Sequence, residues 1–138
     1  MVQESQTTEN SKTTILLAED EPAVRELLQR ILKKDGYSIL VATDGQEALQ
    51  IAGEHPADGI DLLVSNVQMP GMTGPDLAKE LKQSRPNLRV LLVSAYPQGI
   101  LMPDSGWSFL QKPFLPKAIL DKVRQTLQST PHEETHSG

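Results

Sequence analysis

The sequence contains no cysteine, and this absence excludes several kinds of chemistry at once. Without thiols the chain forms no disulfide, carries no thiolate nucleophile and offers no cysteine ligand to zinc. A reducing compartment is compatible with such a composition.

Two further features are missing: long apolar runs and clusters of basic residues. The N-terminal segment MVQESQTTENSKTT is polar where a signal peptide needs an apolar core, and no apolar stretch approaches the length that spans a bilayer. The formal net charge is -5, with no run of lysine and arginine. We therefore expect a cytoplasmic protein that by itself binds neither nucleic acid nor an anionic membrane.

The composition that remains describes one compact domain with polar ends. Of the 138 residues, 38% are hydrophobic and 22% are charged, which is enough apolar material for a core. Residues 1–12 and 130–138 are polar and short of apolar anchors, so we expect disordered tails there. The folded domain is then predicted to cover residues 13–129.

Within this domain, short apolar runs alternate with helical patterns. The apolar runs predict five strands, at 14–18, 38–43, 61–66, 89–95 and 108–112. Helices are predicted from Pro22 to just before Gly36, and at 44–55, 74–84 and 115–128. The first helix carries its apolar residues in one stripe, formed by Val24, Leu27, Leu28, Ile31 and Leu32. Regular alternation of strand and helix predicts an α/β fold with a doubly wound parallel sheet.

One connection departs from this alternation, between the fourth and fifth strands. The segment QGILMPDSGW, residues 98–107, holds two glycines and Pro103, and is too short and too broken for a normal crossover helix. We therefore predict that the fourth helix is shortened or missing. The apolar residues of this segment either form a patch for a partner or cover the edge of the sheet; they are Ile100, Leu101, Met102 and Trp107.

In an open parallel sheet the binding site lies outside the carboxyl ends of the strands. The residues at those ends are Glu19, Asp20, Asn66, Ser94 and Lys112. Two adjacent acids can hold a hard cation such as Mg²⁺ through oxygen and leave positions for water or phosphate. A lysine can neutralise a phosphoryl oxygen and a hydroxyl can donate to another, so the set predicts a site for a phosphoryl group and its metal.

Four motifs give this pattern a family resemblance over nearly all of residues 13–129. They are LLAEDEP, LLVSNVQMPGMTG, LLVSAY and FLQKPF, in this order and with the expected helices between them. The chain resembles the receiver domain of bacterial two-component response regulators, of the chemotaxis-regulator type. This resemblance implies a flavodoxin-like, five-stranded parallel sheet in the order 2-1-3-4-5.

The resemblance also implies a role for each site residue. In the family, an aspartate accepts a phosphoryl group from a kinase histidine, beside Mg²⁺ held by the acidic pair, that aspartate and a backbone carbonyl. The resemblance implies that Glu19 and Asp20 are the acids that bind the metal, that Gln68 binds it through its backbone carbonyl, and that Asn66 occupies the acceptor position and is a further metal ligand. It implies that Lys112 is the phosphate partner and that Ser94 and Phe109 are the switch hydroxyl and the switch aromatic. Pro113 is implied to be a cis-proline. The implied partner is a sensor histidine kinase, a parent hybrid kinase or another signalling protein.

Position 66 breaks the family pattern, because the acceptor aspartate is replaced by Asn66. An amide is a poor nucleophile and cannot yield the acyl phosphate, so ordinary phosphotransfer should fail here. Mg²⁺ should bind weakly or not at all, since one carboxylate is gone and Glu19 stands where many relatives carry the shorter aspartate. Asp61 is no obvious substitute, as it lies at the other end of the same strand.

Two explanations for Asn66 are compatible with the sequence: a naturally divergent receiver that works without phosphorylation, or a deliberate inactivating substitution.

A Mg²⁺-dependent phosphatase or phosphoryl-transfer enzyme on the same fold is the alternative function. It lacks an evident nucleophile and a second base. A nucleotide-binding domain would need a glycine-rich turn after the first strand, which AEDEPA does not provide. We therefore expect a non-enzymatic interaction module.

Overall fold

The computed structural model of the chain describes residues 13–95 and 107–128. The elements in these residues are β1 (Thr14–Ala18), α2 (Pro22–Lys34), β2 (Ser38–Ala42), α3 (Gly45–Gly53), β3 (Leu62–Asn66), α4 (Gly74–Ser84), β4 (Arg89–Ser94), β5 (Ser108–Gln111) and α5 (Pro116–Gln128). None of the helices in this part of the chain has the length and apolar character needed to cross a bilayer.

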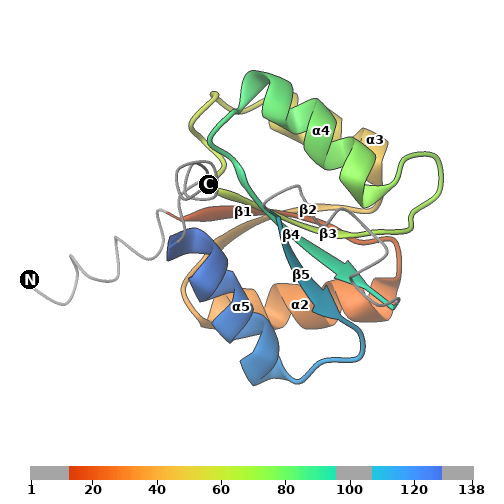
Figure 1. The fold of residues 1–138 in the computed structure, drawn as a ribbon, viewed down its shortest axis with the longest axis vertical. Coiled ribbons are helices and arrows are strands. Elements are labelled where there is room, and N and C mark those ends of the chain that lie inside the picture. Colours follow the sequence, from red (N-terminus) through yellow and green to blue (C-terminus); the bar gives the residue numbers. More distant parts are fainter. Residues whose placement is uncertain (1–12, 96–106, 129–138) are drawn as a thin grey trace, which may run out of the picture.

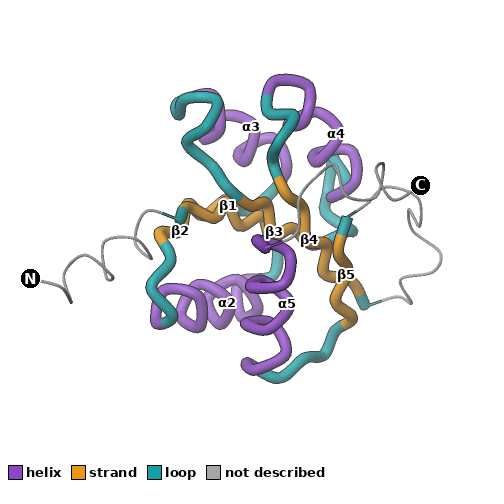
Figure 2. Tube along the Cα trace, turned by 60° about the vertical axis from the view of Figure 1, so that its left-hand side comes forward, coloured by secondary structure: helices purple, strands orange, loops and turns teal. Residues whose placement is uncertain are grey.

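The five strands form one parallel sheet in the order β2-β1-β3-β4-β5. Helices α3 and α4 cover one face of the sheet and α2 and α5 cover the other (Figures 1 and 2). The predicted doubly wound, flavodoxin-like fold is thus confirmed. Because all strands run the same way, their carboxyl ends meet at one edge of the sheet.

A separate apolar core lies on each face of the sheet, because successive side chains of a strand point to opposite faces. Leu16, Leu63 and Leu92 are buried toward α3 and α4. Ile15 and Leu17 alternate with Leu16 and are buried toward α2 and α5. Every residue of β3 is buried, which is the expected environment for the central strand of such a sheet.

The helix ends follow the local signals in the sequence. Pro22 is the first residue of α2, where its missing N–H costs no hydrogen bond. After the helix, Gly36 takes a φ of 100°, a left-handed conformation that favours glycine. Within the predicted apolar stripe of α2, Leu28 and Leu32 are buried, whereas Leu27 is 41% exposed.

The connection between β4 and β5 falls largely outside the described residues. The crossover helix between β4 and β5, predicted to be shortened or missing, and the patch formed by Ile100, Leu101 and Met102 therefore lie outside the described residues. Trp107 is described, and it is half-buried against the core beneath α3 and α4. For this residue the structure favours the alternative in which it covers the sheet. The predicted tails also lie outside the described residues.

Candidate functional site

Residues from four strand ends meet in one pocket at the carboxyl edge of the sheet. Asn66 and Ser94 are the last residues of β3 and β4, Lys112 directly follows β5, and Asp20 lies in the loop after β1. The pocket has a volume of about 240 Å³. Its lining consists of Asp20, Glu21, Asn66, Gln68, Ser94, Ala95 and Lys112.

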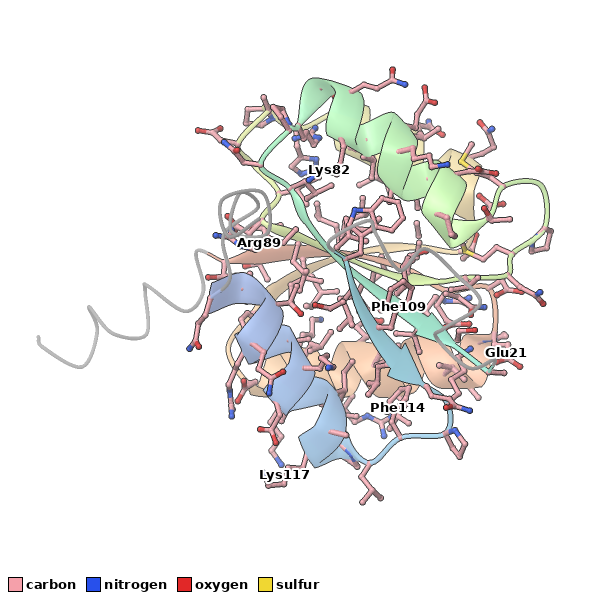
Figure 3. All side chains as sticks on the ribbon, viewed as in Figure 1. Glu21, Lys82, Arg89, Phe109, Phe114 and Lys117 are labelled. Carbon is pink, nitrogen blue, oxygen red and sulfur yellow. The ribbon has the colours of Figure 1, made fainter. Side chains whose placement is uncertain are left out.

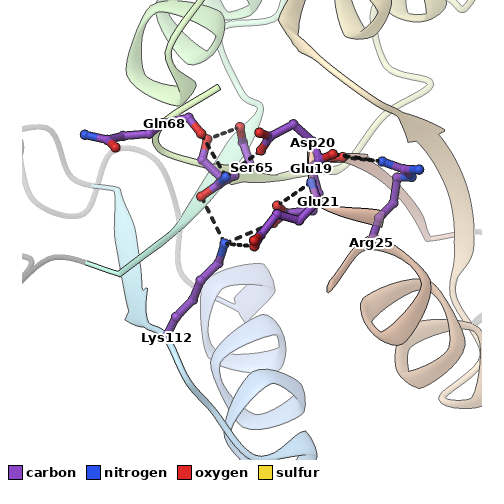
Figure 4. A network of polar contacts seen from close by, with 8 residues as sticks. Glu19, Asp20, Glu21, Arg25, Ser65, Gln68 and Lys112 are labelled. Carbon is purple, nitrogen blue, oxygen red and sulfur yellow. Dashed lines mark hydrogen bonds and ion pairs between the residues drawn. The ribbon is translucent and has the colours of Figure 1, made fainter. Parts of the chain in front are cut away.

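Asp20, Gln68 and Lys112 belong to one network of polar contacts in this pocket (Figure 4), and each of them is hydrogen-bonded to the side-chain amide of Asn66. Its Nδ2 donates to Oδ1 of Asp20 at 2.8 Å and to the backbone oxygen of Gln68 at 2.9 Å. Its Oδ1 accepts from Nζ of Lys112 at 3.3 Å. A flipped amide would set oxygen against two oxygens and NH₂ against an ammonium group, so these neighbours fix the orientation.

Lys112 is shared among three oxygens. Besides the Asn66 amide, its Nζ lies 3.4 Å from Oε1 of Glu19 and 3.6 Å from Oε1 of Glu21. The contact with Glu19 is an ion pair without hydrogen-bond geometry, so among the described residues this buried carboxylate oxygen has no hydrogen-bond donor. The lysine that the resemblance assigns to a phosphoryl group is therefore engaged by the protein's own acids.

Glu19 is fully buried, in contrast to Asp20 and Glu21, the two acids that line the pocket. Burial raises the pKa of its carboxyl group, and the backbone N–H of Glu21 and the charge of Lys112 lower it only in part. The donor from Glu21 lies 3.2 Å from Oε2. Desolvation raises the pKa of the Glu19 carboxyl group more than these partners lower it, which is typical of a buried acid with one incomplete ion pair.

The network includes three residues that the sequence analysis did not assign to the site: Glu21, Arg25 and Ser65. Nη1 of Arg25 donates to the backbone oxygen of Glu19 at 3.0 Å and to that of Asp20 at 3.4 Å. The buried Ser65 hydroxyl donates to the backbone oxygen of Asn66 at 2.8 Å. Arg25 could have been suspected, because it lies one helical turn after the acidic loop.

The remaining predicted residues surround this network. The backbone N–H of Lys112 donates to the backbone oxygen of Ser94 at 2.7 Å, which joins β5 to β4 beside the pocket. The peptide bond between Lys112 and Pro113 is cis, as expected. Phe109 is half-buried against the core beneath α3 and α4, and Phe114 packs on the opposite face (Figure 3). Phe109 does not line the pocket itself.

Asp61 lies away from this site. It precedes β3, and its Oδ2 accepts from the backbone N–H of Thr14 at 2.8 Å, at the amino end of β1. It lines a different hollow of about 250 Å³ beside Arg85. This placement agrees with the expectation that Asp61 is no substitute for an acceptor at position 66.

The side chains as arranged do not fit a divalent cation. Mg²⁺ requires oxygen ligands, yet Asn66 points N–H donors at both Asp20 and the Gln68 carbonyl. The second acid, Glu19, faces Lys112 instead. Within residues 13–95 and 107–128, no three side chains of His, Cys, Asp or Glu are grouped so that they could hold a metal.

Comparison with known proteins gives a consistent result at the level of families. The sequence profile described as "Response regulator receiver domain" matches residues 15–124. The chain is 37% identical to the sensor kinase CckA of Brucella abortus (strain 2308), over 86% of this chain and 13% of that protein. It is 35% identical to the response regulator MprA of Mycobacterium tuberculosis (strain ATCC 25177 / H37Ra), over 87% of this chain and 53% of that protein.

Solved structures show the same likeness in three dimensions. The crystal structure of the receiver domain from the hybrid histidine kinase CckA has a TM-score of 0.73 and 43% identity, and covers 83% of this chain and 99% of that chain. The response regulator TrrA from Thermotoga maritima, solved in complex with Mg²⁺-BeF, has a TM-score of 0.71 and 30% identity. That alignment covers 83% of this chain and 98% of TrrA.

Proposed function

Because the chain belongs to the family of response regulator receiver domains, we propose that residues 13–129 form a receiver module that signals without phosphorylation at position 66. Two-component signalling is the context that the family membership supplies. The finer statement, independence from phosphorylation, rests on a single observation. Asn66 stands at the end of the central strand, where the family resemblance places the acceptor aspartate, and its amide is hydrogen-bonded on both sides.

The chemistry of the amide supports this proposal. An acceptor must supply an anionic oxygen that attacks phosphorus and then becomes the bridging oxygen of an acyl phosphate. The Oδ1 atom of Asn66 is neutral and accepts from Lys112, and Nδ2 uses its hydrogens on Asp20 and Gln68. Neither atom can take the place of a carboxylate oxygen. The neighbouring hydroxyl of Ser65 is fully buried and points its hydrogen at a backbone oxygen.

We also propose that Mg²⁺ binds this pocket weakly or not at all. Receiver domains generally bind Mg²⁺ at their acidic pair, and TrrA is a relative solved with Mg²⁺. In this chain the amide donors of Asn66 face the oxygens that the resemblance assigns to the metal. Glu19 and Asp20 remain as the acids that would hold the ion, with Gln68 supplying its backbone oxygen.

The surrounding residues are assigned the roles that the resemblance implies. We propose Lys112 as the phosphate partner, Ser94 as the switch hydroxyl and Phe109 as the switch aromatic of an otherwise intact site. Their support is their position: Lys112 and Ser94 line the pocket, and Phe109 lies on β5 between them in sequence. In the chain with Asn66 these groups would then serve packing and electrostatics rather than phosphotransfer.

The partner that fits this proposal is a protein. The chain spans 13% of the length of the sensor kinase CckA and 53% of the length of MprA. We propose that it works with a sensor histidine kinase, with a parent hybrid kinase or with another signalling protein. The net charge of -5, without basic runs, favours none of the nucleic-acid or membrane contacts that need positive charge.

A phosphatase or phosphoryl-transfer enzyme on this scaffold is the competing function. It would need a nucleophile and a second base, and the pocket-lining acids are hydrogen-bonded to Asn66 or paired with Lys112. A turnover assay with phosphomonoesters and Mg²⁺ separates the two functions. An interaction module releases no phosphate above the buffer rate, whereas an enzyme releases it in proportion to its concentration.

The direct test compares the chain with its Asn66→Asp variant, each incubated with Mg²⁺ and a small-molecule phosphodonor. Intact-mass spectrometry should show one added phosphoryl group on the variant and none on the chain with Asn66. The added group should be labile to hydroxylamine, as acyl phosphates are. Asp61→Asn in the Asn66→Asp background is the matched control, and it should still be modified because Asp61 lies at the opposite edge of the sheet.

Each outcome has a defined meaning. Modification of the chain that carries Asn66 would overturn the proposal. An Asn66→Asp variant that remains unmodified with several donors would leave phosphorylation independence standing but would refute the intact site. It would also favour natural divergence over an inactivating substitution in a working receiver.

A further inference from the structure

The two N–H groups of the Asn66 side chain join two loops that a metal ion would otherwise have to join. Asp20 belongs to the loop after β1, and Gln68 belongs to the loop after β3. Nδ2 lies 2.8 Å from the Asp20 carboxylate and 2.9 Å from the Gln68 carbonyl. Both acceptors are oxygens of the kind that a hard cation attracts.

The amide can join the two loops because its hydrogens carry partial positive charge and reach two acceptors at once. The hydrogen bond to Asp20 is charge-assisted, which makes it stronger than a bond between neutral groups. Asn66 is only 9% exposed, so water competes poorly for either bond. The amide hydrogens of Asn66 thereby supply the positive charge that stabilises the Asp20 and Gln68 oxygens.

A third loop completes the arrangement. Lys112, after β5, donates to Oδ1 of Asn66 at 3.3 Å and is itself held near Glu19 and Glu21. It fixes which side of the amide faces Asp20, because the ammonium group requires the oxygen. One amide therefore connects the loops after β1, β3 and β5.

We propose that the Asn66 amide is a built-in replacement for the divalent cation, which holds these three loops in one arrangement and makes the pocket insensitive to metal. The proposal rests on position 66 being the acceptor position of the proposed function, but it goes beyond the loss of phosphorylation. A cation could enter between Asp20 and Gln68 only if the amide turned, and the turned amide would point its NH₂ at Lys112. An aspartate at position 66 would instead place acceptors against acceptors until a cation arrived.

The test observes the Asn66 side-chain amide directly in the ¹⁵N-labelled full chain. Its two Nδ2 protons, identified by their loss in Asn66→Asp, should exchange with solvent at least roughly tenfold more slowly than those of the exposed Asn87. Millimolar Mg²⁺ should leave their chemical shifts unchanged. Exchange as fast as that of Asn87, or shifts that move with Mg²⁺, would overturn the proposal.

Paramagnetic Mn²⁺ provides the second readout. It should broaden the backbone resonances of residues 19–20 and 66–68 in Asn66→Asp at concentrations that leave the same resonances sharp in the chain with Asn66. Equal broadening in both proteins would contradict a pocket that is closed to metal. Asn66→Ala removes the amide without adding charge, so its melting temperature should fall by roughly 3 to 8 °C with no recovery in Mg²⁺.

These outcomes are separable from those of the phosphorylation test. The chain could resist phosphodonors while its Asn66 protons exchange freely, in which case the amide is merely unreactive and does not replace the cation. Conversely, slow exchange in a chain that still becomes phosphorylated would support the replacement and overturn the proposed function. An unchanged melting temperature in Asn66→Ala would show that the amide holds nothing together.

Discussion

Asparagine differs from aspartate by one group on the side-chain carbonyl, and at position 66 that group reverses the electrostatics of the pocket. A carboxylate would add a third negative charge beside Glu19 and Asp20. The amide instead brings two hydrogen-bond donors, and both are used, on Asp20 and on the Gln68 carbonyl. The amide therefore supplies no anionic nucleophile, and it adds no negative charge that a counter-ion would have to balance.

Glu19 is expected to make the free energy of unfolding depend on pH. Its pKa in the folded protein is raised above the ordinary value of 4.5, mainly by burial. The folded state therefore holds the proton more tightly than the unfolded state, and the free energy of unfolding falls as the pH rises from 4.5 through the folded pKa.

Glu19→Gln should remove this dependence. The difference in unfolding free energy between variant and parent should shift in favour of the variant as the pH rises, by no more than about 1.4 kcal/mol per pH unit because one proton is involved. Urea titrations at several pH values, in buffer with a metal chelator, measure it. A difference that is constant with pH, or that shifts toward the parent, would contradict the raised pKa of Glu19.

The roles of these residues could be predicted from the sequence only in part. The alternation of apolar runs fixes which residues end the strands, so Asn66, Ser94 and Lys112 were expected at one edge. The direction of the Asn66 amide and the sharing of Lys112 with Glu21 could not be predicted, because they depend on side-chain rotamers and on contacts between distant segments. Such details need the three-dimensional arrangement of the loops.

At the scale of elements, the end of β3 and the start of α4 are packed against each other without spare room. Gly74 is the first residue of α4, and its N–H donates to the backbone oxygen of Val67 at 2.8 Å. A Cβ atom at this position would collide with the backbone oxygen of Asn66 and lie 3.1 Å from Oγ of Ser65. The helix can approach the site strand closely only because residue 74 has no side chain.

Gly74→Ala should therefore destabilise the protein by about 1 to 3 kcal/mol, the usual cost of inserting a methyl group into a filled space. Gly53→Ala is the matched control. Gly53 is the last residue of α3, and a Cβ atom there meets nothing within 4 Å. That variant should be unchanged or more stable by up to about 1 kcal/mol. Chemical denaturation measures both, and equal effects at the two glycines would argue against the close approach.

The bounds of the helices and strands were predicted more accurately than the contacts of individual side chains. The predicted bounds of β1 and of α4 agree with the structure, and the other predicted elements differ at their ends by one or two residues. These ends depend on capping and on tertiary contacts, which local pattern does not determine. Leu27 shows the same limit, since helical periodicity places it on the apolar stripe of α2 but does not predict that it is 41% exposed.

For the whole molecule, the parallel sheet decides where chemistry can occur. Residues far apart in sequence, such as Asp20, Asn66 and Lys112, meet because every strand delivers its carboxyl end to the same edge. The two apolar cores hold the strands in place and leave the loops to form the polar network. A single substitution at this edge can thus change the chemistry of the domain while the fold is retained.

The central claim is that one amide replaces both the acceptor carboxylate and its metal, and thermal melting with and without Mg²⁺ tests it most directly. The melting temperature of the chain with Asn66 should not change when millimolar Mg²⁺ is added, relative to NaCl at equal ionic strength. Asn66→Asp should melt lower without metal, because three acids then repel one another, and should gain stability as Mg²⁺ increases. An equal rise in both proteins, or an Asn66→Asp variant that ignores the metal, would contradict the claim.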